Sequence, residues 1–119
     1  MWPLRLSGKQ RQGKLWEERA LRHLQQHGLQ LVEANYHCKS GEIDLICRDG
    51  AVLVFVEVRQ RADRSHGGAA ASITPAKIGR IVRAARTYLM QFTHLPECRI
   101  DVVAIDGEEI DWLQGAIEV

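Results

Sequence analysis

The sequence predicts a single α/β domain in which helices flank a mixed β-sheet, in the chain order αβββαβ. Three observations support this order: an amphipathic helix near the N-terminus, an apolar hairpin in the middle, and a second amphipathic helix before another apolar strand. The strand, helix and strand at the end of this order form a crossover, whose two strands are expected to be parallel. The 119 residues suffice for one hydrophobic core, so one domain is expected.

The composition is ordinary for a globular protein, with 45% hydrophobic and 26% charged residues. No apolar run approaches the roughly 18 residues that cross a bilayer, and the short apolar start is interrupted too soon for a signal peptide. We therefore expect a cytoplasmic protein without a membrane partner. Three cysteines without a Cys-x-x-Cys pair fit neither a disulfide framework nor a structural zinc site.

The N-terminal residues are polar and basic without periodicity, so residues 1–12 are expected to form a flexible basic arm and residues 13–119 the domain. The first helix is expected over residues 14–27, where apolar side chains recur at helical spacing. These side chains are Trp16, Ala20, Leu21 and Leu24. Gly28 is expected to end the helix as its C-terminal cap.

Three strands are expected next, over residues 29–38, 42–47 and 51–61. The pair Asp49-Gly50 is a strong hairpin signal between the second strand and the third. The stretch 62–72 is rich in glycine, alanine and charged residues, which is typical of a mobile loop.

Thr74 and Pro75 predict the start of the second helix, because threonine caps a helix and proline fits its first position. Its apolar stripe continues to about Phe92, and Pro96 then marks a stop. A fourth strand is expected over residues 99–106. The remaining segment, residues 110–119, is consistent with either a short strand or a helix.

Two acids stand in strands that are otherwise apolar, namely Asp44 in the second strand and Glu57 in the third. An unpaired buried carboxylate is costly, so both acids need a reason to be there. If Asp49-Gly50 forms a two-residue loop, Asp44 lies opposite Phe55 and is a diagonal neighbour of Glu57, about 7 Å away at the backbone. A four-residue loop keeps this pairing, whereas a three-residue loop with a bulge breaks it.

A third acid, Glu17, borders the buried stripe of the first helix and can join the other two. Converging acids need a cation or a proton, and oxygen ligands favour Mg²⁺ or Mn²⁺. Arg59 adds a permanent positive charge on the face of Glu57. Carboxylates, a hard metal and a cation suit phosphodiester hydrolysis. The structural alternative is a partly buried salt bridge between Asp44 and Arg59 or Arg61.

The segments GEIDLI, VFVEVRQR, ITPAKIGRIVRAARTYL and IDVVAI resemble the YraN-like family of small bacterial proteins, within the PD-(D/E)XK superfamily of nucleases. The resemblance runs from about Gly13 to the C-terminus. It implies a restriction-endonuclease-like αβββαβ core and a catalytic, metal-binding pair of Asp44 and Glu57. It also implies similarity to archaeal Holliday junction resolvases, in which an acid of the first helix joins the site. Glu17 is the matching residue.

The sequence departs from the superfamily pattern at Arg59, where lysine is usual. Arginine does not lose its proton at neutral pH, but it neutralises charge and grips a phosphate with two hydrogen bonds. We therefore keep Arg59 among the expected catalytic residues. Lys77, at the start of the second helix, is a candidate for a migrated ammonium group.

The resemblance implies a Mg²⁺- or Mn²⁺-dependent nuclease that acts on DNA rather than RNA, with branched or recombination intermediates among its substrates. One alternative is a nucleic-acid-binding protein with a nuclease fold that does not cut. Another is a metal-independent RNA endonuclease that uses histidines such as His37 and His66. Nucleic acid is expected to contact Arg61, Lys77, Arg80 and Arg83. Two cuts on a duplex favour two symmetric sites, so a homodimer is expected.

Overall fold

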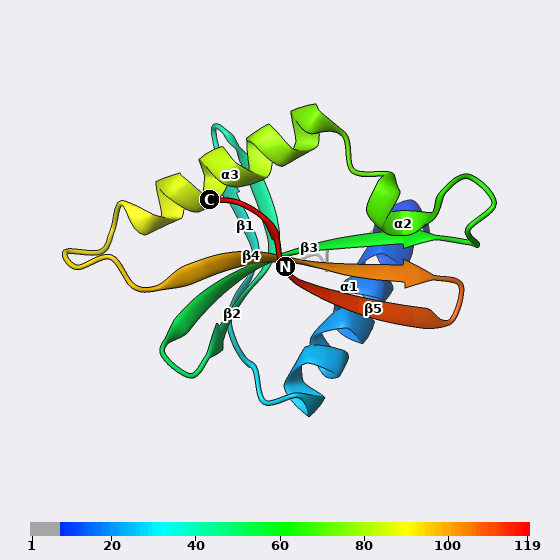
Figure 1. The fold of residues 1–119 in the computed structure, drawn as a ribbon, viewed down its shortest axis with the longest axis horizontal. Coiled ribbons are helices and arrows are strands. Elements are labelled where there is room, and N and C mark those ends of the chain that lie inside the picture. The colour runs from blue at the N-terminus through cyan, green and yellow to red at the C-terminus, as the bar shows by residue number, and fades with distance from the viewer. Residues whose placement is uncertain (1–7) are drawn as a thin grey trace, which may run out of the picture.

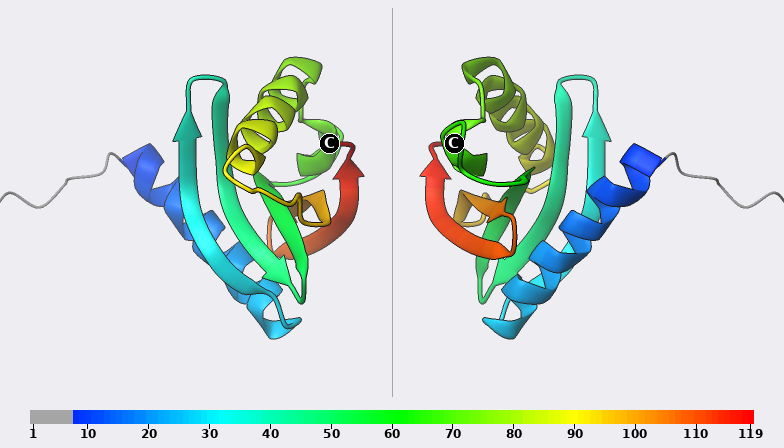
Figure 2. Two further views of the ribbon diagram at one scale, coloured as in Figure 1. Left: turned by 90° about the vertical axis from the view of Figure 1, so that its left-hand side faces the viewer. Right: turned by 90° about the vertical axis from the view of Figure 1, so that its right-hand side faces the viewer.

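A five-stranded sheet in the order β1-β2-β3-β4-β5 lies between α1 on one face and α3 on the other (Figures 1 and 2). The computed structural model describes the backbone of residues 8–119 and the side chains of residues 12–119. The elements are α1 (Gly8–Gln26), β1 (Gln30–Cys38), β2 (Gly41–Asp49), β3 (Val52–Arg61), α2 (Gly68–Ala71), α3 (Pro75–Leu89), β4 (Cys98–Asp106) and β5 (Glu109–Ile117). The mixed sheet flanked by helices confirms the expected fold class.

Helix α1 begins at Gly8, six residues before the expected start, so residues 8–12 of the expected arm are helical. Lys, Gln and Arg are good helix formers, and a turn built from them carries no apolar periodicity to reveal it. Residues 1–7 of the arm lie outside the described residues. The C-terminal cap is confirmed: Gly28 has φ 91°, and the Leu29 N–H donates to the Leu24 carbonyl at 3.1 Å.

The β2–β3 hairpin turns through Gly50 and Ala51, because Asp49 pairs with Val52. The expected loop, Asp49-Gly50, is therefore wrong by one residue, and the register differs by two: Ile46 rather than Asp44 lies opposite Phe55. Gly50 has φ 61°, a left-handed conformation that glycine adopts without strain. A shift of two residues keeps every side chain on its expected face.

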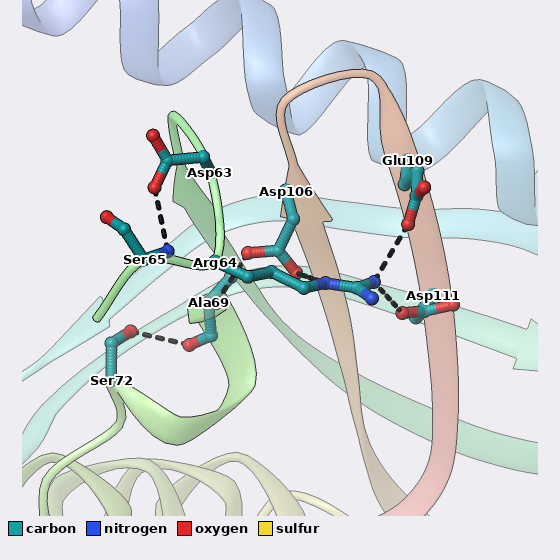
Figure 3. A network of polar contacts seen from close by, with 8 residues as sticks. All are labelled: Asp63, Arg64, Ser65, Ala69, Ser72, Asp106, Glu109 and Asp111. Carbon is teal, nitrogen blue, oxygen red and sulfur yellow. Dashed lines mark hydrogen bonds and ion pairs between the residues drawn. The ribbon is translucent and has the colours of Figure 1, made fainter. Parts of the chain in front are cut away.

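Strand β3 pairs in parallel with β4, which confirms the expected crossover. The stretch expected as a loop contains the one-turn helix α2 and is tied to the β4–β5 hairpin (Figure 3). Asp106 accepts a hydrogen bond from the Ala69 N–H at 2.8 Å. Arg64 lies 3.3 Å from Asp106, 3.0 Å from Glu109 and 2.9 Å from Asp111.

Helix α3 starts as expected, with Pro75 in its first position and the side chain of Thr74 accepting a hydrogen bond from the Lys77 N–H. It ends at Leu89, slightly earlier than expected. The C-terminal segment, which was open between strand and helix, is strand β5 and pairs antiparallel with β4.

Two hydrophobic clusters fill the spaces on either side of the sheet. Leu53 and Phe55 of β3 pack towards α3, whereas Val54 and Val56 pack towards α1. This division matches the alternation that the sequence predicts. Among the described helices, none is long and apolar enough to cross a membrane.

Candidate functional site

The site lies where β2 separates from β3. Their last paired residues are Leu45 and Val56. One step further, Asp44 Oδ2 accepts a hydrogen bond from the Val58 N–H at 2.8 Å. The Asp44 carboxylate thus satisfies a backbone donor at the open end of the ladder. Asp44 and Glu57 are not paired in the ladder, but their side chains are close enough for the hydrogen bond and the charge of Asp44 to act on Glu57.

Glu57 is a buried acid without a hydrogen-bond partner for one of its oxygens. Its side chain is 3% exposed, and Oε2 accepts no hydrogen bond from the described residues. Burial, followed by the hydrogen bond and charge of Asp44, raises the pKa of Glu57 well above its ordinary value. The charges of Lys77 and Arg59 oppose this shift. A buried carboxyl oxygen without a hydrogen bond is costly. The ammonium of Lys77, 3.6 Å from Oε2, compensates its charge in part.

Glu17 approaches the same region from α1. Burial and the charge of Asp44 together raise the pKa of Glu17 from 4.5 to about 7, while a hydrogen bond from Asn35 lowers it. Glu17 and Asp44 line one open pocket of about 400 Å³, whose other lining side chains include Trp16 and Arg59. The structure therefore brings Glu17 from α1 to the end of the β2–β3 ladder near Asp44, as the sequence predicts.

The acids do not form a closed set of metal ligands. Within residues 12–119, no group of three or more His, Cys, Asp or Glu side chains is arranged to hold a metal ion. Asp44 and Glu57 form the tight pair, and Glu17 is coupled to Asp44 through its charge. Any ion at this place would thus need further ligands from water or substrate.

Arg59 is half-buried, and its guanidinium is bound to Ser72 rather than to an acid. Arg61 is exposed, lines the pocket of Glu17 and Asp44, and donates to the carbonyl of Gln60 at 2.7 Å. Neither arginine forms an ion pair with Asp44 in the described part of the chain. The structure therefore does not support the alternative in which a salt bridge to Arg59 or Arg61 is the reason for an acid at position 44.

Lys77 reaches the site from α3, and its Nζ lies 3.6 Å from Glu57 Oε2. Lys77 and Arg80 line a second pocket of about 380 Å³, together with His37 and Glu42 of the β1–β2 hairpin. Arg83 is exposed further along α3. Of the expected nucleic-acid-binding residues, Lys77 and Arg80 therefore share one pocket and Arg61 lines the other, whereas Arg83 lines neither.

The two histidines considered for metal-free catalysis, His37 and His66, are exposed, and each contacts a nearby side chain outside the acid site. His37 Nδ1 lies 3.2 Å from Glu42 Oε2, and His66 Nδ1 lies 3.0 Å from Ser65 Oγ. Since these two histidines lie on different segments with separate partners, the structure offers no acid–base histidine pair from them.

Sequence reasoning missed Asn35, which lies on β1. Its φ of 55° makes it the one non-glycine residue with positive φ among the described residues. Its neighbours Ala34 and Tyr36 pair with Leu45 and Ile43, so Asn35 lies opposite Asp44. An asparagine tolerates this left-handed conformation better than most residues, but nothing in the strand pattern reveals it. Ser72, the partner of Arg59, was missed because their contact joins two segments separated in sequence.

Comparisons with known proteins give one family. The sequence model described as "Uncharacterised protein family UPF0102" matches residues 16–105, a range that contains all three acids of the site. UPF0102 protein HEAR0176 of Herminiimonas arsenicoxydans is 56% identical over 106 residues, which cover 89% of this chain and 86% of that protein. UPF0102 protein Mpe_A3766 of Methylibium petroleiphilum is 57% identical over 109 residues, which cover 86% of this chain and 89% of that protein. A UPF0102 protein of Janthinobacterium sp. (strain Marseille) is 53% identical over 112 residues, which cover 94% of this chain and 91% of that protein.

Proposed function

The chain belongs to the uncharacterised protein family UPF0102, as its YraN-like segments predict, and we propose that it is a metal-dependent nuclease that hydrolyses phosphodiester bonds in DNA. The observation that carries the proposal is the pair of Asp44 and Glu57 at the point where β2 leaves β3. Glu57 is buried there, and its Oε2 accepts no hydrogen bond and has only the Lys77 ammonium 3.6 Å away, a costly arrangement that a bound cation would relieve.

The residues present fit a hard divalent cation such as Mg²⁺ or Mn²⁺. Asp44 and Glu57 would hold the ion, with Glu17 joining directly or through water. Such an ion supplies Lewis acidity, which activates water and stabilises charge on the phosphate. The incomplete set of protein ligands is compatible with Mg²⁺, which usually keeps several waters and is completed by substrate phosphate.

The residues of the chain position this chemistry. The Val58 N–H fixes the orientation of Asp44, and strand β3 carries Glu57 beside it. In the hydrolysis, the oxygen of a water molecule forms a bond to phosphorus and one ester P–O bond breaks. The water proton passes to a carboxylate of the site or to solvent, and the leaving oxygen takes up a proton. The exposed cations Arg61, Arg80 and Arg83 attract the polyanion towards this place.

A second candidate function is the binding of nucleic acid without cleavage. Two observations favour it: the ammonium of Lys77 already lies 3.6 Å from Glu57, and no described group of three acids is arranged to hold a metal. A lysine that supplies positive charge to the acid makes a cation at this place less necessary. In this candidate, the acids would have a structural role, and the basic side chains around them would hold the phosphates.

Cleavage assays separate the two candidates. Branched, flapped and linear DNA and a structured RNA are each incubated with Mn²⁺ or with a chelator. We expect Mn²⁺-dependent cleavage of DNA that falls by about 100-fold or more in Asp44→Asn. The exposed Asp63 gives the matched control, because Asp63→Asn should cut like the unaltered protein. Cleavage of RNA in chelator would support the metal-independent alternative.

Calorimetry with Mn²⁺ tests the metal site without requiring activity. We expect the unaltered protein to bind the ion and Asp44→Asn to bind it far more weakly. Equal binding by the two proteins would show that the site is misplaced. No cleavage of any substrate, together with intact DNA binding, would leave the binding protein as the function.

A cytoplasmic location and a homodimer belong to the same proposal. Cutting both strands of a duplex is easiest with two sites related by a twofold axis. Light scattering at micromolar concentration is expected to give twice the chain mass, and a single species of 13.5 kDa would remove the dimer.

A further inference from the structure

Two cations lie near the buried Glu57, and they have different partners. Arg59 donates from Nε to Ser72 Oγ and from Nη2 to the Ser72 carbonyl, both at 3.2 Å. Ser72 Oγ in turn donates to the Ala69 carbonyl of α2 (Figure 3). The ammonium of Lys77, in contrast, lies 3.6 Å from Glu57 Oε2. The lysine therefore faces the acid, while the arginine holds a connecting segment.

That connecting segment determines where α3 begins. Ser72 is followed two residues later by Thr74, the N-terminal cap of α3. The Thr74 side chain accepts a hydrogen bond from the Lys77 N–H at 3.2 Å, which places Lys77 in the first turn of the helix. Arg59 extends from β3, two residues after Glu57. It therefore fixes the start of α3, and with it the backbone of Lys77, to the strand that carries the acid.

The side chain of Lys77 depends on such an anchor. It carries a compact charge on a flexible four-carbon stem, so its own geometry does not fix the position of the ammonium. The side chain is only 20% exposed, and charge interactions strengthen as water is excluded. A shift of the first turn of α3 would thus change the position of the ammonium relative to Glu57.

We propose that Lys77 is the cation that contacts the substrate phosphate at the acid site, and that Arg59 is a positioning residue that acts on Lys77 through Ser72. This inference rests on the proposed nuclease function. Negative charge increases on the phosphate oxygens as water attacks, and a fixed ammonium stabilises that charge. Lys77 forms no covalent bond and keeps its proton throughout.

A double-mutant cycle on cleavage tests both roles. Lys77→Met should lower kcat by about 100-fold, the scale of one lost charge-stabilising donor. Arg59→Gln should lower it by about 10- to 100-fold through misplacement of the ammonium. Because Arg59 acts through Lys77, the double variant should be no slower than Lys77→Met alone. Losses that multiply would mean that Arg59 touches the substrate itself, and would overturn the positioning role.

Two further variants keep this test clear of folding effects. Ser72→Ala removes the hydroxyl acceptor of Arg59 but keeps the carbonyl acceptor. Ser72→Ala should therefore lower kcat less than Arg59→Gln does. Arg22, exposed on α1, is the matched control, because Arg22→Gln removes the same group far from Ser72 and should leave kcat unchanged. Wild-type activity of Ser72→Ala and Arg59→Gln together would overturn the inference.

A readout that needs no activity measures the position of Lys77 directly. Reductive methylation, followed peptide by peptide with mass spectrometry, should be slower at Lys77 than at the exposed Lys39. In Arg59→Gln, the rate at Lys77 should rise towards that of Lys39, whereas Arg22→Gln should not change it. An unchanged rate in Arg59→Gln overturns the positioning role. If this rate rises but the unaltered protein cuts no substrate, the nuclease function and the contact of Lys77 with phosphate fail, and the Arg59–Ser72–Lys77 link stands.

Discussion

At the scale of single residues, Asn35 has an unfavourable backbone conformation next to the acids of the site. With φ 55°, it occupies a region in which a Cβ atom costs about 1 to 2 kcal/mol. We expect Asn35→Gly, which removes the Cβ strain, to be more stable than Asn35→Ala by about 1 kcal/mol. Gln30, exposed on the same strand, has no positive φ, so glycine should be less stable than alanine there. Urea unfolding of the four variants measures both differences, and the same order at both positions would contradict the strain.

Glu17 is expected to make stability depend on pH. Its pKa of about 7 in the folded protein exceeds its ordinary value of 4.5. The folded state therefore holds a proton that the unfolded state releases, and stability falls as pH rises from about 4.5 to about 7. Glu17→Gln has no such proton, so its melting temperature should exceed that of the unaltered protein at pH 8 more than at pH 4.5.

The neighbouring acid gives the control for this pH dependence. Glu18, the next residue of α1, is exposed, so Glu18→Gln should follow the pH profile of the unaltered protein. Parallel profiles for Glu17→Gln and Glu18→Gln, measured by thermal melting in low salt without divalent ions, would show that Glu17 is not desolvated by the sheet.

At the scale of elements, the β4–β5 hairpin contains a fully buried acid with a complete set of partners. Asp101 accepts hydrogen bonds from Arg99 Nε at 3.0 Å, Trp112 Nε1 at 2.9 Å and the Gly115 N–H at 2.8 Å. Removing one member of a buried charged network leaves the others unpaired, which costs about 3–5 kcal/mol. We expect this loss for Asp101→Ala in urea unfolding.

The exposed Arg64 network of Figure 3 provides the contrast. Arg64 and Asp111 are both more than half exposed, so water screens their ion pair. Asp111→Ala should therefore destabilise the protein far less than Asp101→Ala, although it lies on the same hairpin as the partners of Asp101. Similar losses for the two alanine variants would refute the distinction between a buried network and an exposed one.

The elements also show which signals the sequence carries. The caps at Gly28 and Thr74 are local, since each depends on the conformation of a few neighbouring residues, and both were predictable. The start of α1 was not, because residues 8–12 are glycine, polar or basic residues without an apolar pattern. In the hairpin, the sequence pointed to the turn but not to which two residues form it, since Asp49 is still paired in the strand.

At the scale of the whole molecule, the acids were predictable and Lys77 was a candidate ammonium group, but the contacts that join them were not predictable. Asp44 and Glu57 stand out because an acid among apolar strand residues is conspicuous in the sequence alone. The ion pair of Lys77 with Glu57 and the bond of Arg59 to Ser72 depend on how the crossover packs on the sheet. Contacts between segments distant in sequence leave no periodic trace, so only the three-dimensional structure supplies them.

The charge distribution around the site leads to a prediction about binding. Each lysine or arginine that contacts a phosphate releases counterions, so log affinity for DNA should fall linearly with log salt concentration. With chelator present to prevent cutting, Arg83→Gln should weaken binding and reduce the slope by about 0.9. Arg22→Gln on α1 should change neither quantity, since Arg22 lies outside the proposed contacts. Fluorescence anisotropy at several salt concentrations measures affinity and slope together, and affinity that is indifferent to salt would exclude DNA as the partner of this surface.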